Sequence, residues 1–281
     1  MAHHCAYFTK AVRGFIIKIR KEVIAMTQNE RLIFLLDYLI NESVHYSDME
    51  IPSGIREQKR LLRSFMNIRP PKPVSEEFLK IQDEYLQAET AAKGITDAGK
   101  LLPARGRMYI WQGDITTLKC GAIVNAANSA MLGCFVPCHG CIDNAIHTYA
   151  GVQLRAECDR LMRRQGHEEP TGQAKLTGAY NLPCDNVIHT VGPIISGRLT
   201  EEDSALLRSC YIECLKKAEE NNISSVAFCC ISTGEFHFPN DKAAEIAVNT
   251  VSKYLKYSKI ERVIFNVFKD IDREIYEKLL G

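Results

Sequence analysis

Short apolar runs alternate with longer helical patterns from about residue 107 to the C-terminus, and this alternation restricts the fold more than any other feature. The runs are rich in Val, Ile, Phe and Tyr and occupy residues 108–111, 122–125, 187–191, 226–230 and 262–268. The helical patterns lie near residues 142–165, 204–221, 241–257 and 270–280. Strands that alternate with helices predict an α/β layered domain with a largely parallel or mixed sheet.

Residues 26–95 form an N-terminal helical segment ahead of this domain. Apolar residues recur there at helical spacing, and Ser75 after three prolines is typical of a helix start. The recurring residues are Leu32, Leu35, Leu36, Leu39, Ile40, Leu61, Leu62, Phe65 and Met66. The segment is too short for much of a core of its own, so we expect it to pack on the α/β domain. Residues 96–106 read as a linker, which places the domain at 107–281.

The first 25 residues are basic and amphipathic, with few acidic residues. Three interpretations stay open: an extension upstream of a second start at Met26, an additional surface helix, and a transit peptide.

Composition excludes several classes of protein. Lys and Arg number 35 against 34 Asp and Glu, so the basic excess of a general nucleic-acid binder is missing and we expect no nucleic-acid partner. No apolar run reaches the length of about 18 residues that a membrane helix needs, so we expect no membrane span. The eleven cysteines are odd in number and clustered, which favours free thiols in a reducing, cytoplasmic compartment.

Three loops follow predicted strands, at the edge where α/β sheets bind ligands. They contain Gly113-Asp114-Ile115, then Asn125 to Asn128 (Asn-Ala-Ala-Asn), then Ser232 to Phe236 (Ser-Thr-Gly-Glu-Phe). The Asp114 carboxylate suits an adenine amine, the asparagines suit ribose hydroxyls, and amides ahead of a helix suit phosphate. Each loop alone is also compatible with an ordinary turn.

A fourth stretch, CFVPCHGC at 134–141, lies between Asn128 and Asp143. Three cysteines and one histidine this close together indicate a metal site, because thiolate and imidazole are the ligands that Zn²⁺ takes best.

Four motifs in this order resemble those of the macrodomain family, which binds ADP-ribose on a mixed sheet flanked by helices on both faces. They are GDIT at 113–116, NAAN at 125–128, IHTVGP at 188–193 and ISTGEFHFP at 231–239. The resemblance covers roughly residues 107–281. It implies that Asp114 and Ile115 contact the adenine and that Asn128 contacts the distal ribose and takes part in catalysis. It further implies ligand contacts along the third loop, by Ser232, Thr233, Gly234, Glu235 and Phe236. At the start of the helix that follows residues 134–141, it implies contacts by Ile142, Asp143 and Asn144.

The glycine-rich loop of the commoner hydrolytic macrodomains is replaced here by GCFVPCHGCIDN at 133–144. This pattern is similar to the zinc-dependent macrodomains, a microbial branch that removes mono-ADP-ribose from proteins. Its spacing implies Cys134, His139 and Cys141 as the zinc ligands, with Cys138 as a weaker candidate for a fourth. Three protein ligands favour a catalytic zinc with an open position over a closed structural one.

Asp143 corresponds to the catalytic aspartate of the family, where it would orient or activate water, although a helix-capping role is the simpler alternative. His147, one turn later, is expected to be a satisfied structural histidine. The leading hypothesis is a zinc-dependent hydrolase that releases mono-ADP-ribose from protein side chains. Its alternatives are a non-catalytic ADP-ribose reader with a structural zinc and a hydrolase of small ADP-ribose conjugates. The resemblance also suggests a lipoyl-carrier protein, modified by a sirtuin-type transferase, as the substrate.

Overall fold

A computed structural model describes residues 26–46 and 48–281, so the basic segment 1–25 lies outside the described residues. Three helices form the N-terminal segment: α2 (Gln28–Asn41), α3 (Ile55–Ile68) and α4 (Glu76–Lys93). Five follow in the α/β domain: α5 (Ile142–Ala150), α6 (Val152–Gln165), α7 (Glu201–Glu220), α8 (Asn240–Tyr254) and α9 (Asp270–Leu280). The side chains of Thr27 and Ser75 cap α2 and α4, as expected for Ser75.

Six strands form the main sheet in the order β2-β8-β7-β4-β6-β5. Their bounds are β2 (Met108–Gln112), β4 (Ala122–Ala127), β5 (Ala174–Gly178), β6 (Asn186–Val191), β7 (Ser225–Phe228) and β8 (Arg262–Val267). All neighbours are parallel except β5, which pairs antiparallel with β6 at one edge. The predicted mixed sheet is therefore confirmed. The edge strand β5 was not predicted, because its short Ala-Lys-Leu-Thr-Gly sequence contains no apolar run.

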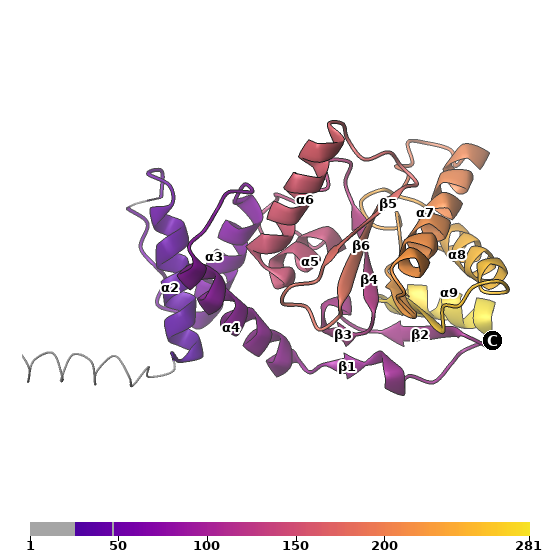
Figure 1. Ribbon diagram of the computed structural model, residues 1–281, viewed down its shortest axis with the longest axis horizontal. Coiled ribbons are helices and arrows are strands. Elements are labelled where there is room, and N and C mark those ends of the chain that lie inside the picture. Colours follow the sequence, from indigo (N-terminus) through magenta and orange to yellow (C-terminus); the bar gives the residue numbers. More distant parts are fainter. Residues whose placement is uncertain (1–25, 47) are drawn as a thin grey trace, which may run out of the picture.

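The sheet lies between two helical layers (Figure 1). α5 and α6 lie on one side of it, and α7, α8 and α9 pack together on the other. The central strands β4 and β6 are buried along nearly their whole length, which explains their continuous apolar sequences. The parallel strands end at a common edge, where the loops with the candidate motifs follow β2, β4 and β7.

The N-terminal segment has an apolar core of its own. Twelve buried residues of α2, α3 and α4 form a cluster separate from the main core, including Leu32, Leu36, Leu62 and Phe78. We expected this segment to be too short to form much of an apolar core, and that expectation was wrong. Each of the three helices has an apolar face, and the helices bury these faces against one another. α3 and α4 also pack against α5, as expected.

Two other local expectations differ from the structure. The predicted linker contains β1 (Thr96–Asp97), which pairs in parallel with β3 (Leu118–Lys119), followed by the 3₁₀ turn η1 (Ala98–Lys100). The single helix expected over 142–165 is divided at Gly151, whose φ of +96° ends α5 and starts α6.

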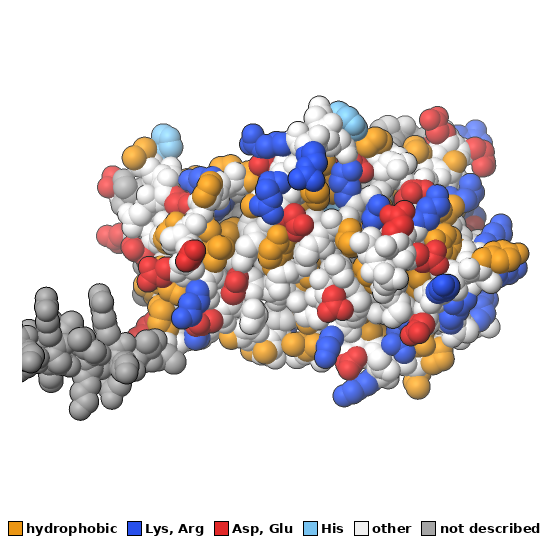
Figure 2. All heavy atoms as spheres, viewed as in Figure 1, with side chains coloured by type: hydrophobic (Ala, Val, Ile, Leu, Met, Phe, Trp, Pro, Cys, Tyr) orange, Lys and Arg blue, Asp and Glu red, His pale blue; other side chains and the backbone are white. Residues whose placement is uncertain are grey.

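The surface charges and the hydropathy of the helices can be compared with what the composition predicts. Figure 2 shows basic and acidic side chains mixed over the face in view, with a group of Lys and Arg over α6. Among the described residues, no helix is both long enough and apolar enough to cross a membrane.

Candidate functional site

Cys134, His139 and Cys141 come together in one loop, which we call the metal loop (residues 134–141). One ligand atom from each lies within 4.8 Å of the others, and all three residues are half-buried. Burial and the neighbouring Cys134 raise the pKa of the Cys141 thiol to about 12. Nδ1 of His139 is buried and has no hydrogen-bond partner among the described residues. A divalent cation would satisfy the imidazole and favour ionised thiols, so this donor set fits zinc.

Cys138 does not belong to this group. Its φ of +54° turns the side chain toward α3, where Sγ lies 3.3 Å from Oγ of Ser64 and 3.4 Å from the carbonyl oxygen of Arg60. Its backbone N–H donates to Oδ1 of Asn67. Within the described chain, the cluster therefore offers three protein ligands, and Cys138 anchors the loop.

The N-terminal segment holds the metal loop in place. Nη2 of Arg63 on α3 donates to the His139 carbonyl oxygen at 2.9 Å and to Oδ1 of Asn144 at 2.7 Å. Asn144 in turn donates through Nδ2 to the carbonyl oxygen of Val136 at 3.0 Å. The side chain of Asn144, a residue predicted to contact ADP-ribose, therefore also supports the loop.

Asp143 lies beneath the metal loop and is 4% exposed. Oδ1 accepts from Nδ2 of Asn125 at 2.8 Å, and Oδ2 accepts from Nδ2 of Asn128 at 3.3 Å. Burial raises the pKa of Asp143 to about 6, and the Asn125 hydrogen bond and the charge of Arg155 oppose this shift. Asn128 thus connects residues 125–128, the predicted ribose loop, to the Asp143 carboxylate.

His147 was expected to be a structural histidine with its hydrogen bonds formed, but the structure differs. Its ring is buried, and neither ring nitrogen has a hydrogen-bond partner among the described residues. Nε2 lies 3.6 Å from Oδ1 of Asp143. Burial lowers the pKa of His147 well below its usual range, so the ring is neutral. His147 also forms a second buried group of potential metal ligands with Cys158 and His189. In that group, however, Nε2 of His189 is already within 2.9 Å of Oγ1 of Thr177.

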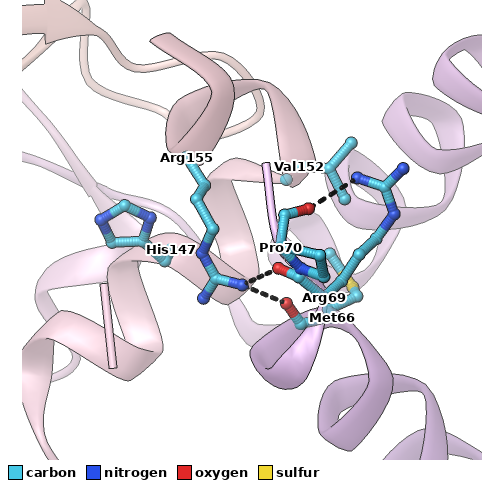
Figure 3. Close-up of a pocket in the computed structure, with 7 residues that line it drawn as sticks. Met66, Arg69, Pro70, His147, Val152 and Arg155 are labelled. Atoms are coloured by element: carbon cyan, nitrogen blue, oxygen red, sulfur yellow. Dashed lines mark hydrogen bonds between the residues drawn. The ribbon is translucent and has the colours of Figure 1, made fainter. Parts of the chain in front are cut away.

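Arg155 joins three parts of the molecule beside His147 (Figure 3). Nη1 donates to carbonyl oxygens at the end of α3, those of Met66 at 3.1 Å, Asn67 at 2.8 Å and Arg69 at 2.5 Å. Figure 3 shows the bonds to Met66 and Arg69. Nε donates to the carbonyl oxygen of Leu132, just before the metal loop, and the guanidinium lies 4.3 Å from the centre of the Phe135 ring. Arg155 therefore fixes α6, the N-terminal segment and the metal loop to one another.

We call residues 113–116 the predicted adenine loop, and an unexpected cation, Lys93, lies beside it. Oδ1 of Asp114 accepts from the backbone N–H and hydroxyl of Thr116, while Oδ2 accepts from Nζ of Lys93 at 3.1 Å. Burial raises the pKa of Asp114, but these partners outweigh it and hold that pKa below its usual value. Asp114 is thus an ionised acceptor, whereas Ile115 is fully buried and offers only its backbone.

The predicted phosphate loop, residues 231–239, faces the metal loop. Ser232 is buried with a φ of +64°, and a Cβ at Gly192 would lie 2.1 Å from its Oγ, so this approach needs glycine. Oε1 of Glu235 lies 3.7 Å from Nε2 of His139. Glu235 thus lies beside the candidate metal ligand His139, while Thr233, Gly234 and Phe236 remain partly or fully exposed.

Several buried polar atoms of this region have no hydrogen-bond partner among residues 26–46 and 48–281. They are Oδ1 of Asn125 and Oδ1 of Asn128 in the NAAN motif, Nδ1 of His139 in the metal loop and Oγ of Ser232 in the predicted phosphate loop. Buried polar groups in native proteins are nearly always bonded, so unpaired ones gathered from separate loops indicate a ligand site.

Sequence reasoning did not identify three residues that shape the site: Arg63, Lys93 and Arg155. The three cations lie on helices far from the motifs, and their spacing matches that of ordinary surface charges.

Comparison with known proteins agrees with this geometry. The Macro domain family matches residues 124–247. The chain is 57% identical over 261 residues to a protein-ADP-ribose hydrolase of Treponema medium, covering 91% of this chain and 100% of that protein. It is 47% identical to a protein-ADP-ribose hydrolase of Staphylococcus aureus strain MSSA476, over 86% of this chain and 94% of that one.

Solved structures are similar as well. A Trypanosoma brucei macrodomain in complex with ADP-ribose superposes with a TM-score of 0.61 at 28% identity, covering 78% of this chain and 95% of that chain. An Oceanobacillus iheyensis macrodomain with ADP gives a TM-score of 0.57 at 35% identity, over 62% and 89%.

Proposed function

The chain belongs to the macrodomain family and is homologous to protein-ADP-ribose hydrolases over most of its length, and we propose that it removes mono-ADP-ribose from protein side chains with the aid of zinc. The observation that carries the proposal is the convergence of the three metal-loop donors, the buried Asp143 and unpaired polar atoms from three loops. Bound ADP-ribose would lie from Asp114 at the adenine to Asn128 and Asp143 at the distal ribose.

Zinc would be held by Cys134, His139 and Cys141, and it supplies Lewis-acid polarisation of a substrate oxygen or of water. Three protein ligands leave a position open for substrate. The alternative is a non-catalytic ADP-ribose reader in which zinc only shapes the loop. That alternative does not explain why two asparagines hold a buried carboxylate at this position.

The residues of the chain would divide the remaining work. Asn125 and Asn128 hold the Asp143 carboxylate, which can accept a proton from water or balance positive charge developing at the ribose. Such general acid–base assistance contributes about 10²–10⁴-fold to rate. The unpaired Oδ1 of Asn128 can accept from a ribose hydroxyl, and Asp114 can accept from the adenine amine.

The test is hydrolysis of a mono-ADP-ribosylated protein together with zinc content and ADP-ribose affinity. We expect Cys134→Ala and His139→Ala to lose zinc and release at least 100-fold less ADP-ribose, while circular dichroism shows the fold unchanged. Full activity of folded protein depleted of zinc contradicts the proposal. Tight ADP-ribose binding without release by the wild type supports the reader instead.

The substrate and compartment are also proposals. We propose a lipoyl-carrier protein, modified by a sirtuin-type transferase, as the substrate, and genes for both beside this one would support it. A cytoplasmic location is in accord with the free state of all ten cysteines in the described residues. Release of ADP-ribose from the modified carrier protein by purified enzyme is the direct measurement.

A further inference from the structure

A cavity of about 360 Å³ lies between α3, α4 and α5, next to the metal loop. Its size is within the range of about 300–1,000 Å³ that is usual for ligand pockets. Its lining includes Lys59, Arg60 and Arg63 of α3, Cys138 of the metal loop and Tyr149 of α5. The predicted adenine, ribose and phosphate loops contribute nothing to this lining, so the cavity is separate from the expected ADP-ribose path.

The charges around this cavity do not balance. Lys59 is paired with Glu89, the one acidic residue of the lining, at 2.7 Å. Arg63 donates to neutral acceptors, the His139 carbonyl and the Asn144 amide. In the part of the chain that the structure describes, neither Arg60 nor Arg63 has a carboxylate within 4.0 Å. Two positive charges are therefore available to an anion.

Part of the cavity lining is apolar and aromatic. The buried side chains of Leu62, Met66 and Leu86 contribute to it, and so do Tyr85 and Tyr149. A group that fits both features carries a negative charge on an apolar stem, as the side chains of aspartate and glutamate do.

The position of the cavity connects it to the reaction centre. Cys138 forms part of its wall, and His139, the next residue, belongs to the zinc ligand group. Arg63 contacts the cavity on one side and the His139 carbonyl on the other. A protein attached to the distal ribose must leave the site near the metal loop, so part of it can reach this cavity.

We propose that the cavity is a subsite for an acidic segment of the ADP-ribosylated protein, with a carboxylate bound between Arg60 and Arg63. This inference rests on the proposed hydrolase function and adds a preference among its protein substrates. The N-terminal helices then have a role in substrate selection, because α3 supplies both arginines.

The experiment compares two mono-ADP-ribosylated peptides that share the modified residue and differ only in flanking aspartates or asparagines. We expect the wild type to favour the acidic peptide by about fivefold in kcat/KM at low salt, as suits one or two partly exposed ion pairs, and less at high salt. Arg60→Glu should remove this preference through a higher KM. Arg56→Glu is the matched control, because Arg56 is exposed on the same helix outside the cavity lining, and it should retain the preference.

Equal cleavage of both peptides by the wild type overturns the subsite, and so does a preference that survives Arg60→Glu or is lost equally in Arg56→Glu. If neither peptide is cleaved, the hydrolase function fails separately. Fluorescence anisotropy of the same labelled peptides then decides the subsite: tighter binding of the acidic peptide that Arg60→Glu abolishes supports it, and equal binding of both refutes it.

Discussion

Gly133 lies directly against the imidazole ring of His147. A Cβ added at Gly133 would be 2.7 Å from Cγ of that ring, and the φ of Gly133 is +80°. The entrance to the metal loop therefore depends on glycine for both space and backbone conformation. Nε2 of His147 lies 3.6 Å from Oδ1 of Asp143, so this contact connects the loop to that buried carboxylate.

Gly133→Ala should displace the metal loop. The buried His147 ring has little room to move away from the added Cβ, and a φ of +80° is strained for alanine. We expect a loss of about 1–3 kcal/mol in unfolding free energy and a lower zinc content after purification. Gly140→Ala in the same loop is the control, because nothing lies within 4 Å of its added Cβ and its φ is not positive. Equal zinc content in the two variants would contradict the prediction.

Asp143→Asn should stabilise the protein in the presence of a chelator while abolishing activity. The folded pKa of about 6 lies above the unfolded value of about 3.9, so the carboxyl favours folding when protonated and loses that contribution as pH rises through 6. Above pH 7 the variant should be more stable by about 2–3 kcal/mol, and near pH 4 by little. Urea unfolding of the variant and the wild type at both pH values measures the difference in unfolding free energy. A difference that does not grow with pH would refute the prediction.

Arg155→Met should destabilise the fold more than any exposed arginine substitution. It leaves buried carbonyl oxygens of α3 and Leu132 without their donor, at a cost of about 2–4 kcal/mol. The comparison is Arg163→Met on the same helix, because the Arg163 side chain is 76% exposed and pairs with Asp159 at the surface. Chemical denaturation of both variants is the measurement, and similar midpoints would show that the Arg155 contacts contribute little.

Asp114→Ala should weaken ADP-ribose binding by about tenfold, because an ionised acceptor for the adenine amine is lost. The Lys93 and Thr116 contacts keep that carboxylate ionised, so the effect should be constant from pH 6 to 8. Calorimetric titration with ADP-ribose tests this, with the exposed Asp185→Ala as control. Unchanged affinity would remove Asp114 from the adenine contact.

Local pattern was sufficient for much of the architecture. The central strands β4 and β6 and the helix α9 lie close to the residues where apolar spacing predicts them. The zinc ligand candidates come together as their spacing implies, because all three belong to one loop of eight residues. Prediction failed at Gly151, where one glycine conformation divides a continuous helical pattern, and at β5, which needs its partner β6 to be recognisable.

The sequence by itself predicted five of the six strands of the main sheet, the order of the loops and the donor atoms, because these depend on residues close together in the chain. Only the tertiary structure decided that Arg63, Lys93 and Asn67 of the N-terminal segment support the metal and adenine loops. These contacts join residues separated by tens of positions, and they exist because two independent apolar clusters dock through α3, α4 and α5. Docking depends on complementary surfaces, which periodicity along a chain does not encode.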